Sequence, residues 1–251
     1  MGVVLAALDN SLAVNPVLVV ARALARVLGD RVEAVHVLGE GTESAESAAG
    51  AAGVPLRLSS GRVVERLVEA GHAPEVDAVV IGARGTVRTG NPLGSTALAV
   101  VSSLGTPVVV VPPDGRVAPR LHRVLVPLEG TTSTSLAPRS IVELAADVAI
   151  DVIVLRIDEE GEPDVTADEF LARYCPWGID SVRLEQRSGS RDQLVPLLAE
   201  ETGADLIAFG WADQLSAGRA PVVQAALKGA HVPVMLIPVL TPPEVMEGAL
   251  R

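Results

Sequence analysis

The chain contains one pattern of short apolar strands twice, and this repeat constrains its fold more than any other feature. Each strand-like run in the first half has a counterpart roughly 120 to 128 residues further along. Self-similarity of this kind indicates two copies of one folding unit. The matching runs are residues 3–9 with 123–129, 32–37 with 151–156, 77–82 with 205–210, and 106–112 with 232–238.

A polar segment divides the two copies. Residues 114–121, DGRVAPRL, combine Pro and Gly with charged side chains, which is typical of a linker. We therefore expect a first domain at residues 1–114 and a second domain at residues 121–240. A length of 251 residues accommodates two domains of this size.

Within each copy, continuous apolar strands alternate with helical segments. This order predicts an α/β fold in which a doubly wound, mainly parallel five-stranded sheet has helices on both faces. In such sheets a ligand binds beyond the carboxyl ends of the strands, where the strand order reverses. The last strand of each copy would be an exposed edge in an isolated unit, so we expect the two last strands to pair with each other.

A glycine-containing loop joins a strand at residues 76–81 to a helix at residues 95–104. Gly82 and Gly85 can adopt backbone angles closed to other residues and leave room for a ligand, and Gly94 opens the helix with free N–H groups. These donors, together with the positive end of the helix dipole, favour an anion such as a phosphate.

Two arginines, Arg84 and Arg88, add cationic side chains that can bind phosphate oxygens in bidentate fashion. An ordinary surface turn followed by a Ser-capped helix fits the same residues. Asp9, at the end of the first strand, could likewise contact a ligand or cap the helix that begins near Leu12. The residues alone leave both alternatives open.

Motifs and composition argue against several other functions. The single lysine, Lys228, is followed by Gly229, so the chain lacks a P-loop. Gly39-Glu40-Gly41 lacks the third glycine of a dinucleotide fingerprint, and we expect a loop with one irregular helical turn after it. A net charge of −11 and an aromatic content of 2% disfavour a nucleic-acid partner.

The remaining composition favours a cytoplasmic protein without a metal centre. One cysteine and four scattered histidines form no disulfide and no recognised zinc spacing, so we interpret them as structural. No apolar run approaches the length of a membrane span, and we expect neither export nor membrane contact. Residues 1–118 carry 9 basic and 11 acidic groups and residues 119–251 carry 11 and 20, so the first half tolerates an anion better.

Taken together, these motifs resemble the universal stress protein family in a tandem, two-domain form. The shared features are a first strand ending in Asp9, a second ending in His36-Val37, Gly82-x-Arg84-Gly85 followed by Gly94-Ser95-Thr96, and last strands of the type Pro-Val-Val-Val-Val. The resemblance implies an adenine nucleotide hydrolase-like fold and an ATP site, with or without magnesium, in the first copy. The residues implied for this site are Ala7, Leu8, Asp9, Val37, Ile81, Gly82, Arg84, Gly85, Gly94, Ser95 and Thr96. The loop from Thr86 to Leu93 is one residue shorter than the family pattern.

The second copy departs further from the family pattern. Asp213 stands at the place of Gly85, and Ala220-Pro221-Val222 stands at the place of Gly94-Ser95-Thr96. Pro221 contributes no N–H, and Asp213 would repel phosphate. We expect the second copy to keep the fold and lose the nucleotide, which makes the chain an intrachain pseudo-dimer through its last strands. A homodimer of whole chains stays open.

The resemblance therefore implies an ATP-binding stress-response protein that acts through nucleotide-dependent conformation or through binding of protein partners that the sequence does not identify. We find no well-placed general base and expect no catalysis beyond slow ATP hydrolysis. A nucleotide-free interaction scaffold is the alternative. An ATP-pyrophosphatase would need a glycine-rich phosphate loop after the first strand, which residues 9–12 do not supply.

Overall fold

The computed structural model describes residues 1–9, 11, 13–39, 42–83, 93–128, 148, 150–158, 169, 182–211 and 221–238. The first half runs through β1 (Val3–Leu8), α1 (Val14–Leu28), β2 (Arg31–Val37), α2 (Thr42–Ala52), β3 (Leu56–Ser59), α3 (Val63–Gly71), β4 (Val76–Gly82), α4 (Ser95–Ser103) and β5 (Val108–Val111). The second half contributes β6 (Arg123–Leu128), β7 (Asp151–Asp158), β8 (Val182–Ser188), α8 (Arg191–Glu201), β9 (Leu206–Trp211), α9 (Pro221–Gly229) and β10 (Val234–Pro238).

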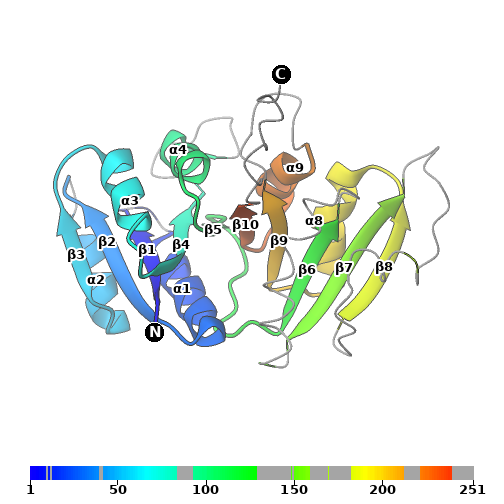
Figure 1. Ribbon diagram of the computed structural model, residues 1–251, viewed down its shortest axis with the longest axis horizontal. Helices are drawn as coiled ribbons and strands as arrows, with labels where there is room; N and C mark the ends of the chain where they lie inside the picture. The colour runs from blue at the N-terminus through cyan, green and yellow to red at the C-terminus, as the bar shows by residue number, and fades with distance from the viewer. Residues whose placement is uncertain are drawn as a thin grey trace, which may run out of the picture.

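The ten strands of the described residues form one continuous sheet, which confirms the α/β fold class. The strand order is β3-β2-β1-β4-β5-β10-β9-β6-β7-β8, so each half has the same internal order and the two halves meet at their last strands (Figure 1). Neighbouring strands are parallel within each half, and β5 and β10 pair antiparallel. The two expected five-stranded sheets are therefore joined edge to edge.

The apolar runs form buried strands because the sheet is covered on both faces in the first half. Helices α1 and α2 pack on one face with Val4 and Ala6, while α3 and α4 pack on the other with Val3 and Leu5. This alternation of core sides follows from the two-residue period of a strand. In the second half, α8 and α9 lie on the same side as α3 and α4.

Helix α2 corrects one expectation from the sequence. The segment after Gly39 was expected to hold a single irregular turn, but α2 is a regular helix of 11 residues. Its alanines explain the difference, because alanine has the highest helix propensity and costs little side-chain entropy. Ala45 and Ala49, one turn apart, are buried against the core, so a weakly amphipathic sequence still has a usable packing face.

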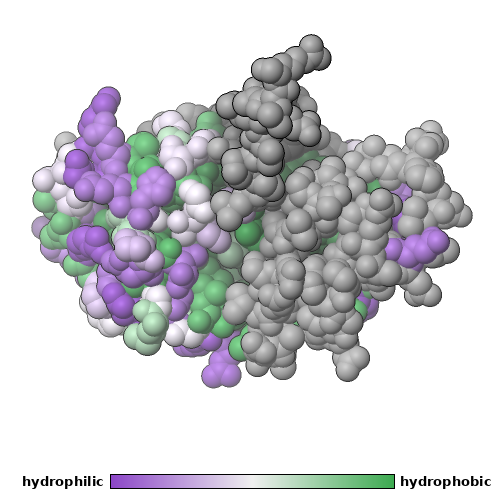
Figure 2. All heavy atoms as spheres, in the orientation of Figure 1, coloured by the Kyte–Doolittle hydropathy of each residue, from purple (hydrophilic) through white to green (hydrophobic). Residues whose placement is uncertain are grey.

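The inner and outer edges of the sheet differ in character. At the centre, Val110 lies opposite Val234 and Val109 opposite Met235, and all four side chains are buried. The outer strands carry charged residues instead, as in the ion pairs Arg57–Glu33 at 3.1 Å and Arg187–Glu185 at 2.9 Å. Hydrophilic and apolar residues are interspersed on the visible face of the first half (Figure 2). Charges at an outer edge disfavour further strand pairing, whereas the apolar inner edges cover each other.

The linker between the halves is fastened to both of them. Arg26 of α1 donates through Nη1 to the Pro119 carbonyl at 2.6 Å, and Arg116 donates through Nη2 to the Ala204 carbonyl at 2.6 Å. Asp205 then accepts the N–H groups of His122 at 2.8 Å and Arg123 at 3.1 Å through Oδ2. These bonds hold the halves in a fixed relation.

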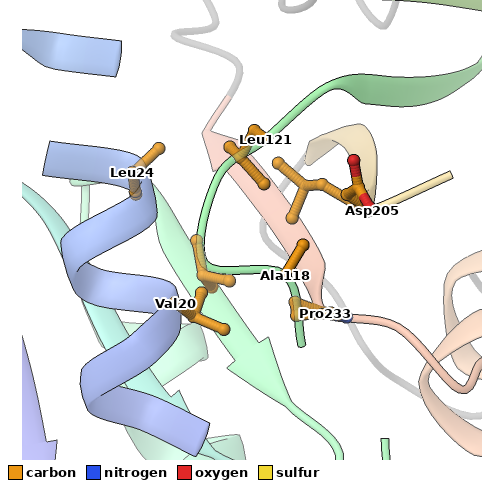
Figure 3. Close-up of a pocket in the computed structure, with 8 residues that line it drawn as sticks. Val20, Leu24, Ala118, Leu121, Asp205 and Pro233 are labelled. Atoms are coloured by element: carbon orange, nitrogen blue, oxygen red, sulfur yellow. The ribbon is translucent and has the colours of Figure 1, made fainter. Parts of the chain in front are cut away.

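A small, mainly apolar cavity lies under this linker (Figure 3). Val20 and Leu24 line it from α1, Ala118 and Leu121 from the linker, and Leu206 and Pro233 from the second half. Leu206 begins β9 and Pro233 precedes β10, so the cavity lies at the amino ends of these strands. Ligands of open α/β sheets bind at the carboxyl ends, and this cavity is therefore a packing feature of the junction.

Candidate functional site

The strand order reverses between β1 and β4, and this places the candidate site. From β1 the chain proceeds outward through β2 and β3, and it then returns to β4 and β5 on the other side of β1. Strands β1 and β4 are parallel neighbours, with Ala7 opposite Ile81 at the end of their pairing. The residues that follow them, Leu8 and Gly82, therefore lie side by side at the switch point, where an open α/β sheet binds its ligand.

The end of β1 leads into a hydrogen-bonded turn. Asp9 accepts through Oδ1 from the Ser11 N–H at 2.9 Å and from the Ser11 hydroxyl at 2.6 Å. The Ser11 hydroxyl oxygen in turn accepts the Ala13 N–H at 3.1 Å. The N-cap residue of α1 is Ala13, without a side-chain cap bond, so Asp9 closes the turn between β1 and α1 and does not cap the helix itself. Within the described part of the chain, Oδ2 of Asp9 has no recorded partner and is available to a ligand.

A backbone bridge brings the start of α4 to the end of β4. The Gly94 N–H donates to the Ala83 carbonyl at 2.8 Å, and the Ala83 N–H donates to the Val111 carbonyl at 2.8 Å. Ala83 and Leu93 are both buried in the core that α3 and α4 cover, so the two ends of the glycine loop are anchored. The predicted site residues Arg84 and Gly85 and the neighbouring Arg88 fall between these anchors, outside the described residues.

The amino end of α4 has the character expected of an anion site. Ser95 and Thr96 are its first two residues, and its first turn contains no acidic side chain. The N–H groups of a first turn have no partner within the helix, and the helix dipole adds partial positive charge there. The N-cap is Gly94, without a side-chain bond, which corrects the alternative of a Ser-capped helix: Ser95 is the first helical residue and not the cap.

The expectation that Gly82 adopts backbone angles closed to other residues is wrong. Gly82 ends strand β4 and is not among the glycines with positive φ, and Gly94 has φ −64° and ψ 157°, which other residues adopt readily. Special backbone angles therefore do not explain these two glycines. The absence of a side chain next to the end of β1 is the property that remains relevant to a ligand.

Val37, the remaining predicted site residue, ends β2 beside β1. It is buried in the same core cluster as Ala7, Ile81 and Leu93. The structure therefore brings together at one end of the sheet every predicted site residue that it describes. These are Ala7, Leu8, Asp9, Val37, Ile81, Gly82, Gly94, Ser95 and Thr96.

His36, which the sequence argument interpreted as structural, is a buried polar residue of this region. It lies opposite Leu8 in the β1–β2 register, its side chain is 4% exposed, and its Nδ1 is 2.9 Å from the Leu8 carbonyl oxygen. The sequence shows that its side chain points away from that of Val37, but the contact with β1 depends on register between strands.

The corresponding end of the second half is built differently. Helix α9 begins with Pro221, which has no N–H to offer, so the first turn has one donor fewer. Residues 212–220, which include Asp213 and the Gly218-Arg219 pair, lie outside the described residues.

No curated protein sequence matches this chain. Its residues 40–112 do match the model of the universal stress protein family. This stretch of the first half is a universal stress protein domain. It extends from α2 to the end of β5 and so includes the glycine loop and α4.

Solved structures of low sequence identity share the fold over nearly the whole chain. A universal stress protein from Archaeoglobus fulgidus DSM 4304 has 18% identity and a TM-score of 0.71, with 95% of this chain and 96% of that chain covered. A functionally unknown protein from Pseudomonas aeruginosa PAO1 has 10% identity and a TM-score of 0.64, with 95% and 93% covered. The cytoplasmic domain of a prokaryotic cation chloride cotransporter has 8% identity and a TM-score of 0.57, with 94% and 95% covered. Because proteins as different as these share the architecture, the function must be argued from the site.

Two further findings bear on the site. Among the described residues, no group of three or more His, Cys, Asp or Glu side chains is placed to hold a metal ion. In the same part of the chain, no helix is long and apolar enough to cross a membrane.

Proposed function

We propose that this chain is a cytoplasmic ATP-binding protein of the stress response, with one nucleotide bound in the first half. The observation that carries the proposal is the bridge from Gly94 to Ala83, because it sets the free N–H groups of α4 against the switch point between β1 and β4. The universal stress protein domain at residues 40–112 supports the choice of an adenine nucleotide. Nucleotide binding alters the conformation or the protein partners of this half.

The site divides into two parts under this proposal. Ala7, Leu8, Asp9 and Val37 hold the adenine and ribose at the ends of β1 and β2, and Oδ2 of Asp9 accepts a hydrogen bond from a hydroxyl or amine of the ligand. Ile81, Gly82, Arg84 and Gly85 line the path toward the phosphates, which meet Gly94, Ser95 and Thr96 at α4. The first turn of α4 carries no acidic side chain that would oppose the negative charge of the phosphates.

Magnesium enters this site with the nucleotide. The described residues offer no carboxylate cluster of their own for the ion, and Mg²⁺ commonly binds through substrate phosphates with one or two carboxylates. We propose the protein as a nucleotide-responsive binder, with ATP hydrolysis slow or absent, because the free carboxylate oxygen of the described site, Oδ2 of Asp9, is assigned to the adenine and ribose and not to the attacking water.

The decisive experiment is a calorimetric titration of nucleotide-stripped protein with ATP and Mg²⁺. Saturation near one nucleotide per chain, with a rise in the thermal unfolding midpoint, supports the proposal. Two nucleotides per chain would contradict the assignment to the first half alone. No heat and no thermal stabilisation would favour the alternative, a scaffold of the universal stress type that acts without nucleotide.

A further inference from the structure

His36 is a buried polar residue in a strand whose other inward positions are apolar. Its neighbours Ala34, Val35 and Val37 are all buried hydrophobic residues, and the imidazole is 4% exposed. Among the described residues Nε2 has no hydrogen-bond partner, so the ring leaves one polar atom unsatisfied in this part of the core. Packing alone would favour an aliphatic side chain here, since an unsatisfied buried polar atom destabilises a fold.

The other nitrogen makes a directed contact. A carbonyl oxygen can only accept, so Nδ1 must carry a proton in its 2.9 Å contact with the Leu8 carbonyl, and Nε2 is the ring nitrogen left without a partner among the described residues. The position of the Nδ1 proton is therefore fixed by the carbonyl group of β1.

This contact occurs where β1 leaves the sheet. Pairing with β4 ends at Ala7, and pairing with β2 ends at Leu8 itself. Beyond this point the ladder no longer orients the backbone, and the next residue is Asp9 with its bonds to Ser11. The His36 side chain thus holds the last strand peptide before the turn that carries the Asp9 carboxylate.

The second half provides an internal comparison at the same place. Arg156 lies opposite Leu128 at the end of β6, as His36 lies opposite Leu8, and it too is buried. Its guanidinium forms an ion pair with Asp158, with Nε 2.7 Å from Oδ1. A guanidinium with its own counter-ion stands where the first half has an imidazole bonded to β1.

We propose that His36 is a positioning residue for the nucleotide site, which it serves by fixing the peptide between Leu8 and Asp9. The inference rests on the function proposed above. His36 does not touch the nucleotide in this arrangement; it holds the β1 backbone and the Asp9 carboxylate at the angle from which they contact the ligand.

Two substitutions separate the donor from the bulk of the side chain. His36→Phe keeps a ring of similar size but removes the donor, and His36→Asn keeps an N–H donor that can take the place of Nδ1. We expect His36→Phe to weaken binding of MgATP about tenfold or more, and His36→Asn to stay within about threefold of the original protein. Hydrogen exchange at the Ser11 amide, which donates to Asp9, should accelerate in His36→Phe and recover in His36→Asn.

Arg156→Leu is the matched control, because it removes the buried polar residue at the same strand position of the second half. It should leave the affinity for MgATP unchanged even where it lowers the unfolding midpoint. This control separates a loss of binding from a general loss of stability.

The outcomes distinguish this inference from the proposed function. If the original protein binds MgATP and His36→Phe binds it equally well, or His36→Asn loses as much affinity as His36→Phe, the positioning role is wrong while the nucleotide site stands. If His36→Phe fails to fold, the affinity and Ser11 exchange of His36→Asn decide, since both must stay near the original values. If the original protein binds no MgATP, the proposed function fails and this role fails with it.

Discussion

The two halves of the sheet share a register but differ at the ends of their central strands. Val4 and Leu5 pair with Ala78 and Val79 in the first half, and Val124 and Leu125 pair with Leu206 and Ile207 in the second. In the first half the pairing continues to Ala7 and Ile81, whereas in the second it stops at Leu125 and Ile207. The pairing of the central strands is therefore the same in both halves at the amino ends and differs toward the carboxyl ends.

Pro127 gives a physical reason for this divergence. It stands in β6 at the place of Ala7 in β1, and a proline cannot donate an N–H to the ladder. Pro221 likewise opens α9 where Ser95 and Thr96 open α4. Both prolines remove backbone donors at the end of the sheet where the first half has its candidate site.

The comparison teaches that the fold and the site depend on different residues. Apolar side chains in the middle of the strands determine the sheet, and they are equivalent in the two halves. A few residues at the strand ends would determine whether a ligand can approach, and they differ between the halves without a change in the strand order.

The largest effect is expected from a side chain at the start of α4. Gly94→Leu adds a branched side chain at the N-cap of α4, which is bonded to the end of β4 and lies where we propose the phosphates bind. We expect MgATP binding to weaken by at least about 100-fold, equivalent to about 2.7 kcal/mol. Calorimetric titration measures this directly.

Gly105→Leu is the matched control for this substitution. Gly105 lies just after α4, and a Cβ built there meets no atom within 4 Å. Its affinity should equal that of the original protein. If Gly94→Leu binds MgATP with unchanged affinity, the phosphates do not lie at the start of α4 and the proposed site is wrong.

A smaller effect, on stability, is expected where Asp205 accepts the hydrogen bonds between the linker and the second half. Asp205→Ala leaves the N–H groups of His122 and Arg123 without their shared acceptor. We expect the free energy of unfolding to fall by about 2 kcal/mol, because part-buried donors lose a charged partner. Denaturant titration provides the measurement.

Asp151→Ala controls for the loss of a carboxylate in the same region. Asp151 pairs with Arg123 at 3.0 Å, but the two side chains are 63% and 36% exposed. We expect a change of less than about 1 kcal/mol, as is typical of exposed ion pairs. Equal losses in both variants would mean that the linker is not fastened through Asp205.

Much of the fold could be predicted because its determinants are local in sequence. Continuous apolar runs such as residues 77–82 identify parallel strands, and the exposed edge of residues 106–112 indicates the pairing that the structure shows between β5 and β10. Helix α2 was underestimated because its helical signal comes from alanine propensity and not from an amphipathic pattern.

The site was less accessible to sequence reasoning because its contacts join distant segments. Asp9 was identified by its place after a strand, but its bonds to Ser11 and the missing cap on α1 required coordinates. The contact between His36 and Leu8 depends on how β1 and β2 are aligned, which no local pattern specifies. The argument from backbone angles at Gly82 was wrong, and the anion site that the glycine motif indicates stays a prediction.

A modest effect is expected from restoring the missing donor in the second half. Pro127→Ala gives β6 the same residue as Ala7 in β1. We expect a change in the free energy of unfolding of less than about 1 kcal/mol, and no gain of a second nucleotide, because Pro221 still opens α9. A second bound nucleotide in the calorimetric titration would show that Pro127 alone suppresses the site.

The smallest effect concerns Asp77, which is the counterpart of Asp205 in the first half. Asp205 is buried and accepts two N–H groups, but Asp77 is exposed and lies beside Asp30, whose Oδ1 already accepts the Gly2 N–H at 2.7 Å. The pKa of Asp77 is raised above its ordinary value of 3.8. The largest cause is desolvation, and the side-chain hydrogen bond with Asp30 and the repulsion from the Asp30 carboxylate raise it further.

A raised pKa means that the folded state binds the Asp77 proton more tightly than the unfolded state. The stabilising contribution of this proton is complete below about pH 3.8 and is lost as the pH rises through the folded-state pKa. Asp77→Asn, which cannot ionise, should therefore be slightly more stable than the original protein at pH 7, by at most about 0.5 kcal/mol, and lose this advantage in acid. Asp205→Asn should destabilise at pH 7, because an amide accepts the two N–H groups less strongly than a carboxylate. Thermal unfolding at pH 7 measures both changes in stability. Changes of opposite sign would show that the equivalent residues Asp77 and Asp205 have different electrostatic roles in the two halves, and changes of the same sign would contradict this.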